Sequence, residues 1–103
     1  MNNEKYLPIG SIVLLKGATK KLMITGFCSI SNENKEVVYD YAGVMFPEGA
    51  INNEVALFNH DQIDKIFYIG YVDEEQKEFV NVLRNFIAKK ELNNIKPVET
   101  QNN

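Results

Sequence analysis

The feature that most limits the fold of this 103-residue chain is a pair of apolar runs near its start, separated by a polar turn. The first run, at residues 11–16, follows Pro8 and Gly10, and the second starts at Leu22. A proline favours extended geometry in the residue before it, and glycine permits a sharp bend. Residues 17–21 therefore predict the reversal between two paired β-strands. No catalytic nucleophile, metal-ligand set or phosphate cradle can be recognised in this stretch, so it specifies a scaffold rather than a reaction.

The second apolar run predicts a long strand at residues 22–31, in which the side chains alternate between two faces. Leu22, Ile24, Cys28 and Ile30 are expected on one face, and Met23, Thr25, Phe27 and Ser29 on the other. Gly26 interrupts the run, which indicates a β-bulge or a bend at a barrel corner.

A third strand is predicted at residues 37–46, where Pro47 ends it. A short strand is expected near the end of the loop at residues 50–57, and Asn59 is a fair N-cap for one helical turn at residues 60–64. The run at residues 66–71 is apolar on both faces, which is typical of a central strand or of a strand whose second face is covered.

The clearest predicted element is a helix from Asp73 to about residue 91. Asp73 is the expected N-cap, acidic residues follow in the first turn, and lysines lie in the last turn, where they complement the helix dipole. Apolar side chains fill an arc of about 160°, which is wider than one sheet contact needs. This stripe consists of Phe79, Val80, Val82, Leu83, Phe86 and Ile87. Residues 93–103 show no periodicity and predict a flexible polar tail.

Together these elements predict one α+β domain over residues 1–92. We expect four or five antiparallel strands in a bent meander, which could approach a barrel, packed by the single C-terminal helix. The length fits one domain, and a chain with 45% hydrophobic residues can bury a core.

Composition argues against several classes of function. The net charge of −3 does not suit sequence-independent binding to nucleic acid or to an anionic membrane surface, because both need a basic footprint. The longest apolar run is too short to span a bilayer, and no signal-peptide pattern opens the chain. We expect a cytoplasmic protein, without excluding export by a route that needs no signal. Cys28 is the single cysteine, so an internal disulfide is impossible, and we expect a buried, inert thiol.

No candidate catalytic group withstands comparison with a structural role. The turn at residues 17–21 lacks the second glycine and the Ser or Thr of a phosphate-binding loop. His60 and Asp61 are the only neighbouring histidine and carboxylate, but neither a nucleophile nor further metal ligands accompany them. We therefore expect no enzyme activity, no cofactor and no bound metal.

Aromatic residues are more numerous than one thin sheet needs. Either all of them fit into one core, or some form an exposed apolar groove or edge that binds a partner protein. For the second interpretation, the candidate partner-binding residues are Val80, Val82, Ile87, Tyr68 and Tyr71. A symmetric homodimer or a different protein would cover such a patch.

An ordered set of short motifs extends over about residues 6–80. It consists of residues 7–17 and 20–24, Tyr39-Asp40-Tyr41 with Gly43, Pro47-Glu48-Gly49, Phe58-Asn59-His60-Asp61 with Ile63, and Gly70-Tyr71. This set resembles a small family of proteins of unknown function from Gram-positive bacteria. The genes of that family lie beside toxins with the LXG domain in type VII secretion loci.

The resemblance implies a context more than a mechanism, and it assigns no catalytic residue. We expect a non-enzymatic, chaperone-like accessory protein that holds a type VII secreted LXG toxin before export. The alternative is an immunity protein that blocks the toxin in the producer cell, where an acidic balance could suit a basic nuclease.

Overall fold

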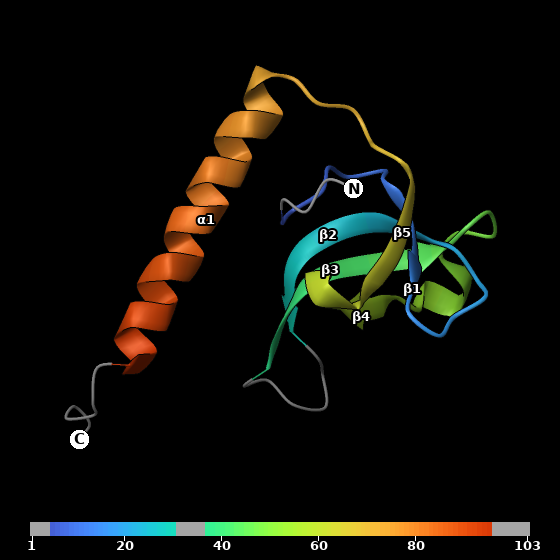
Figure 1. The fold of residues 1–103 in the computed structure, drawn as a ribbon, viewed down its shortest axis with the longest axis horizontal. Coiled ribbons are helices and arrows are strands. Elements are labelled where there is room, and N and C mark those ends of the chain that lie inside the picture. The colour runs from blue at the N-terminus through green and yellow to red at the C-terminus, as the bar shows by residue number, and fades with distance from the viewer. Residues whose placement is uncertain (1–4, 31–36, 96–103) are drawn as a thin grey trace. The chain divides into compact units, whose positions relative to one another are not determined.

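The protein forms one antiparallel β-sheet followed by one long helix (Figure 1), in a computed structural model that describes residues 5–30 and 37–95. The side chains of the helix are described up to residue 88. The strands are β1 (Ile12–Leu15), β2 (Leu22–Ile30), β3 (Val38–Met45), β4 (Ala56–Phe58) and β5 (Ile63–Tyr68), and the helix is α1 (Glu74–Ile95). The predicted α+β class is confirmed.

The strand order is β4-β3-β2-β1-β5. The first four strands form the predicted meander, because each pairs antiparallel with the next one along the chain. β5 does not continue beside β4 but pairs with β1 at the opposite edge. Among the described strands, β4 and β5 do not pair with each other. The sheet is therefore open, and the barrel that the sequence allowed is not formed.

A bulge interrupts β2 at the predicted place. Ile24 pairs with Gly43, whereas Gly26 pairs with Ala42, so Thr25 is the extra residue. A shift of one residue exchanges the two faces of a strand beyond the bulge.

This exchange corrects the expected alternation in the second half of β2. Phe27 now packs against the core, with its ring centroid 6.0 Å from that of Tyr41. Ile30 is exposed. Cys28 has a φ of 51° and is only partly buried, so the expected buried thiol is wrong.

The core of the sheet lies on one of its faces. Its buried members are Leu7, Val13, Leu22, Ile24, Tyr41, Phe58 and Ile63. The ring of Tyr41 stacks on Phe58 with 5.3 Å between centroids. Its hydroxyl oxygen accepts hydrogen bonds from the backbone N–H groups of Tyr6 and Leu7, at 2.9 and 3.1 Å. These bonds hold the residues before β1 against β3.

The single turn before β5 is shorter than predicted. It is a 3₁₀ turn, η2 (His60–Gln62), and β5 begins directly after it at Ile63. Asn59 precedes the turn as expected, and its backbone N–H donates to the side-chain oxygen of Gln62 at 2.8 Å. Another 3₁₀ turn, η1 (Ile51–Asn53), lies before β4.

Residues 1–71 and 72–103 form two units. In the second unit, the backbone N–H of Gln76 donates to Asp73 Oδ1 at 2.9 Å, which confirms Asp73 as the N-cap of α1. α1 continues to Ile95, past the predicted end, because the first helix-breaking residue beyond it is Pro97. Residues 93–95, which were predicted to belong to the flexible tail, are therefore helical, and the rest of the predicted tail lies outside the described part of the chain. Packing of the helix stripe on the sheet stays a prediction.

Candidate functional site

The sheet carries apolar side chains on its second face as well as on its core face. Residues that stand directly opposite each other in neighbouring strands share a face. Tyr68 stands opposite Ile12, and Ile12 stands opposite Met23, so apolar side chains form a row across β5, β1 and β2. Val13 and Ile24, the chain neighbours of this row, point to the core face.

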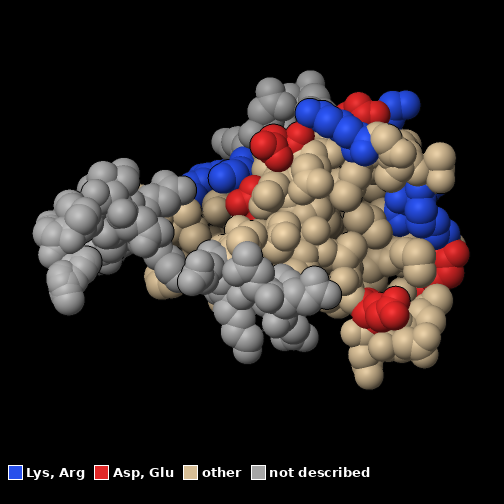
Figure 2. Space-filling view, turned by 90° about the horizontal axis from the view of Figure 1, so that it is seen from below, with Lys and Arg blue, Asp and Glu red and all other residues tan. Residues whose placement is uncertain are grey.

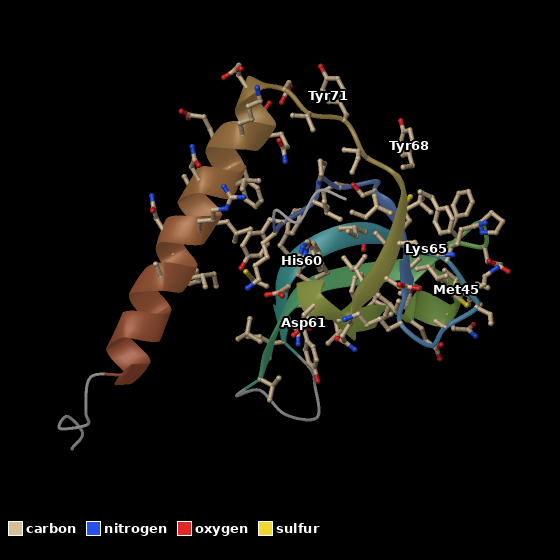
Figure 3. The ribbon with its side chains drawn as sticks, viewed as in Figure 1. Met45, His60, Asp61, Lys65, Tyr68 and Tyr71 are labelled. Atoms are coloured by element: carbon tan, nitrogen blue, oxygen red, sulfur yellow. The ribbon has the colours of Figure 1, made fainter. Side chains whose placement is uncertain are left out.

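A groove of about 450 Å³ follows this row. We call it the apolar groove, and its lining consists of Gly10, Ile12, Lys21, Met23, Phe46, Phe67 and Tyr68. Phe67 is 54% exposed and Tyr68 is 62% exposed, and both belong to β5, which is an edge strand of the sheet. Figure 3 shows the ring of Tyr68 directed away from β5. Natural edge strands usually carry charges or a covering element, so an exposed apolar edge marks a candidate contact surface.

Lys21 is the single charged residue in the lining of the apolar groove. Its Nζ lies 5.3 Å from the centroid of the Phe67 ring, in a cation–π arrangement. The neighbouring Lys20 is different, since its Nζ donates to Glu48 Oε2 at 2.7 Å. This hydrogen bond is the main reason why the pKa of the Glu48 carboxyl is lowered. Within the described residues, no carboxylate lies within ion-pair distance of Lys21.

Charges elsewhere on the surface are mixed in sign. On the face shown in Figure 2, Lys and Arg side chains lie beside Asp and Glu at the margin of a largely uncharged surface. What distinguishes Lys21 is its position, because it is the one charged side chain in an otherwise uncharged lining.

A second pocket is polar, and one of its lining residues, His60, contacts the hydroxyl of Tyr41. Its volume is about 470 Å³, and it is lined by Lys5, Asp40, Asn59, His60 and Asp61. His60 and Asp61 are labelled in Figure 3.

The Tyr41 oxygen lies 2.8 Å from His60 Nδ1. Because that oxygen already accepts bonds from the backbone N–H groups of Tyr6 and Leu7, the hydroxyl hydrogen is donated to the imidazole nitrogen. Burial raises the pKa of the Tyr41 hydroxyl, against the opposing effect of the two N–H donors. Tyr41 is thus a neutral donor to His60.

Asp40 completes the polar pocket. Its Oδ2 accepts a hydrogen bond from the backbone N–H of His60 at 2.8 Å, and its own N–H donates to Asn59 Oδ1 at 3.0 Å. Lys5 Nζ lies 3.5 Å from Asp40 Oδ1. These bonds connect the N-terminal segment, β3 and η2. In this network His60 links Tyr41 to Asp40.

Within the described residues, no group of three or more His, Cys, Asp and Glu side chains could hold a metal ion. No helix in the same part of the chain is long and apolar enough to cross a membrane.

The candidate residues from the sequence belong to both units. Tyr68 lines the apolar groove, and Tyr71, which is 79% exposed, follows shortly after it. Val80, Val82 and Ile87 lie on α1, in the second unit. A surface that combines the helix residues with the two tyrosines stays a prediction.

Sequence reasoning missed Phe46, Phe67, Met23 and Lys21 as neighbours in one groove. The available signal was the run at residues 66–71, which is apolar on both faces. That signal did not identify the neighbours, because it does not show that β5 pairs with β1 rather than with β4.

The fold and the groove define a small α+β domain with an exposed apolar face on its sheet. A family model described as a domain of unknown function, DUF4176, matches residues 6–79. The chain belongs to this family. The match includes all five strands and ends early in α1. Searches of curated proteins and of solved structures find no match.

Proposed function

We propose that this protein is a non-enzymatic binding protein of the cytoplasm that holds a secreted protein toxin before export. The proposed partner is a toxin with an LXG domain, carried by a type VII secretion system. The observation that supports a binding role is the apolar groove, whose aromatic side chains are exposed on an edge strand. The toxin class is taken from the resemblance in the ordered motifs.

The exposed aromatic side chains of the apolar groove favour binding, because a partner would remove them from water. Burial of apolar surface contributes about 25 cal/mol per Å², so a partner that covers Phe46, Phe67 and Tyr68 gains affinity from each of them. Large aromatic side chains at the centre of a contact commonly carry most of its binding energy. A protein that shields an apolar toxin segment in the producer cell needs such a surface.

The test is co-expression of the full chain with the toxin that is encoded beside it, followed by co-purification and titration calorimetry. We expect a complex that Phe67→Ser weakens strongly. Val55→Ser is the matched control, because Val55 is also 54% exposed but lies outside the lining of the apolar groove. Equal binding by both variants and the parent, or no complex at all, would contradict the proposal.

The same complex separates the accessory role from immunity. An accessory protein is expected to bind the LXG end of the toxin and to raise the amount exported. Binding to the toxic end, together with protection of a sensitive cell, would identify an immunity protein instead.

A further inference from the structure

We propose that the apolar groove binds a protein segment that carries a carboxylate beside apolar side chains, and that Lys21 pairs with this carboxylate. The inference rests on the proposed function for the origin of the segment, and it adds the chemistry by which the segment is recognised.

The charge of the segment follows from the environment of Lys21. Its Nζ is held over the Phe67 ring, and no carboxylate among the described residues pairs with it. The rest of the lining is uncharged. An acidic side chain placed here would form a charge-assisted hydrogen bond at the border of an apolar contact, where partial desolvation strengthens it. A basic side chain at the same place would be repelled by Lys21.

The choice of a protein segment over a small molecule follows from the shape of the site. Pockets for small ligands bury most of the surface of the ligand. Here the lining side chains Phe67 and Tyr68 are more than half exposed, and the groove extends across strands β5, β1 and β2. A small acid would stay largely in water on this surface. A segment of a protein covers both the groove and its margin.

The experiment uses the full chain, immobilised, and a displayed library of random linear peptides as the probe. We expect the selected peptides to be enriched in Asp or Glu next to aromatic or aliphatic residues. Their affinity for the Lys21→Met variant should be about tenfold lower, because this change keeps an apolar stem and removes the charge.

Lys65→Glu is the control for net charge. Lys65, labelled in Figure 3, is exposed on the same strand as Phe67. It is not among the residues that line the apolar groove, so peptide binding by this variant should equal that of the parent. Selection on a Lys21→Glu variant should enrich Lys or Arg in place of the acidic residues. Selection of no peptides, peptides without acidic enrichment, or equal affinity for the parent and Lys21→Met would each overturn the inference.

The outcomes separate this inference from the proposed function. A toxin complex that is unaffected by Lys21→Met keeps the proposed function and overturns the carboxylate site. Acidic peptides that depend on Lys21, in a protein that binds no toxin, keep the site and overturn the proposed partner.

Discussion

At the scale of single residues, Tyr41 joins three parts of the first unit through one oxygen atom. The oxygen accepts hydrogen bonds from the backbone N–H groups of Tyr6 and Leu7, which precede β1, and the O–H group donates to His60 Nδ1 in η2. The ring lies fully buried between Phe27 and Phe58. A buried N–H donor that loses its acceptor lowers the stability of the fold considerably. The Tyr41 hydroxyl accepts from two such donors, so it contributes more to stability than one ordinary hydrogen bond does.

We therefore predict that Tyr41→Phe lowers the free energy of unfolding by about 1–3 kcal/mol, since two backbone N–H groups lose their acceptor. Chemical denaturation followed by circular dichroism measures this change. Tyr71→Phe is the control, because Tyr71 is an exposed phenol, and its change should stay within about 0.5 kcal/mol. If Tyr41→Phe is as stable as the parent, the hydroxyl network does not hold the N-terminal segment.

The raised pKa of Tyr41 also predicts a dependence on alkaline pH. The folded state holds the phenol proton more tightly than the unfolded state does, where the pKa is near 10.0. The stabilising effect is therefore complete below about pH 10 and decreases as pH rises through the higher pKa of the folded protein. We expect the free energy of unfolding to fall above about pH 10 in the parent, and to fall less steeply in Tyr41→Phe. Parallel curves for the two proteins would show that Tyr41 does not titrate as described.

The sequence predicted the position of the bulge in β2 but not its effect on neighbouring residues. Gly26 signals an irregular strand because glycine lacks a side chain that packs. The exact extra residue, Thr25, depends on the pairing with Gly43 and Ala42 in another strand, which no local pattern contains. For this reason Phe27 and Cys28 were assigned to the wrong faces.

At the scale of elements, β2 and β3 approach each other closely at Gly43. A Cβ atom at this position would lie 2.8 Å from the carbonyl oxygen of Met23 and 3.2 Å from Cε1 of Phe58. At Gly26 the nearest atom to an added Cβ is the Cβ of Ala42, at 3.7 Å, which is an ordinary contact. A side chain is therefore sterically excluded at Gly43, whereas the space at Gly26 would admit a methyl group.

We predict that Gly43→Ala destabilises the protein by about 1–3 kcal/mol, because the strands must separate to admit the methyl group. Gly26→Ala should change the free energy of unfolding by no more than about 0.5 kcal/mol. Thermal unfolding of the two variants beside the parent provides the comparison. Equal stability of both variants would contradict the close approach at Gly43.

The start of α1 is stabilised by its N-cap residue. Asp73 Oδ1 accepts the backbone N–H of Gln76, so Asp73→Ala should weaken the start of the helix by about 1 kcal/mol. Amide hydrogen exchange at residues 74–77 measures the loss of protection. Asp64→Ala, at an exposed strand position, is the control and should leave these amides unchanged. Unchanged protection in Asp73→Ala would mean that another group caps the helix.

The helix start and the last strand show how far sequence patterns extend. An N-cap is local, so Asp73 could be identified from its neighbours alone. The run at residues 66–71 suggested a central or covered strand, yet β5 is an edge strand with Phe67 and Tyr68 exposed. An apolar sequence pattern indicates that a side chain favours burial. It does not show whether the same chain or another molecule covers that side chain.

At the scale of the whole molecule, the two faces of the sheet differ in what covers them. One face contains the core around Tyr41 and Phe58, and the other contains the apolar groove. A free protein with such a face tends to associate with itself unless a partner covers it. A second copy that covered this face would compete with the toxin complex proposed above.

We predict that Phe67→Asp reduces self-association without unfolding the protein. Phe67 is about half exposed and does not belong to the core, so its replacement should change the free energy of unfolding by only about 0.5 kcal/mol. A charge in the apolar groove opposes burial of that face against a second copy or a partner segment. Light scattering over a range of protein concentrations measures association, and thermal unfolding of the same samples measures the fold. Val55→Asp is the control, since it adds the same charge at an equally exposed position outside the groove. If Phe67→Asp unfolds the sheet, Phe67 is a core residue and the apolar groove is not a free binding surface.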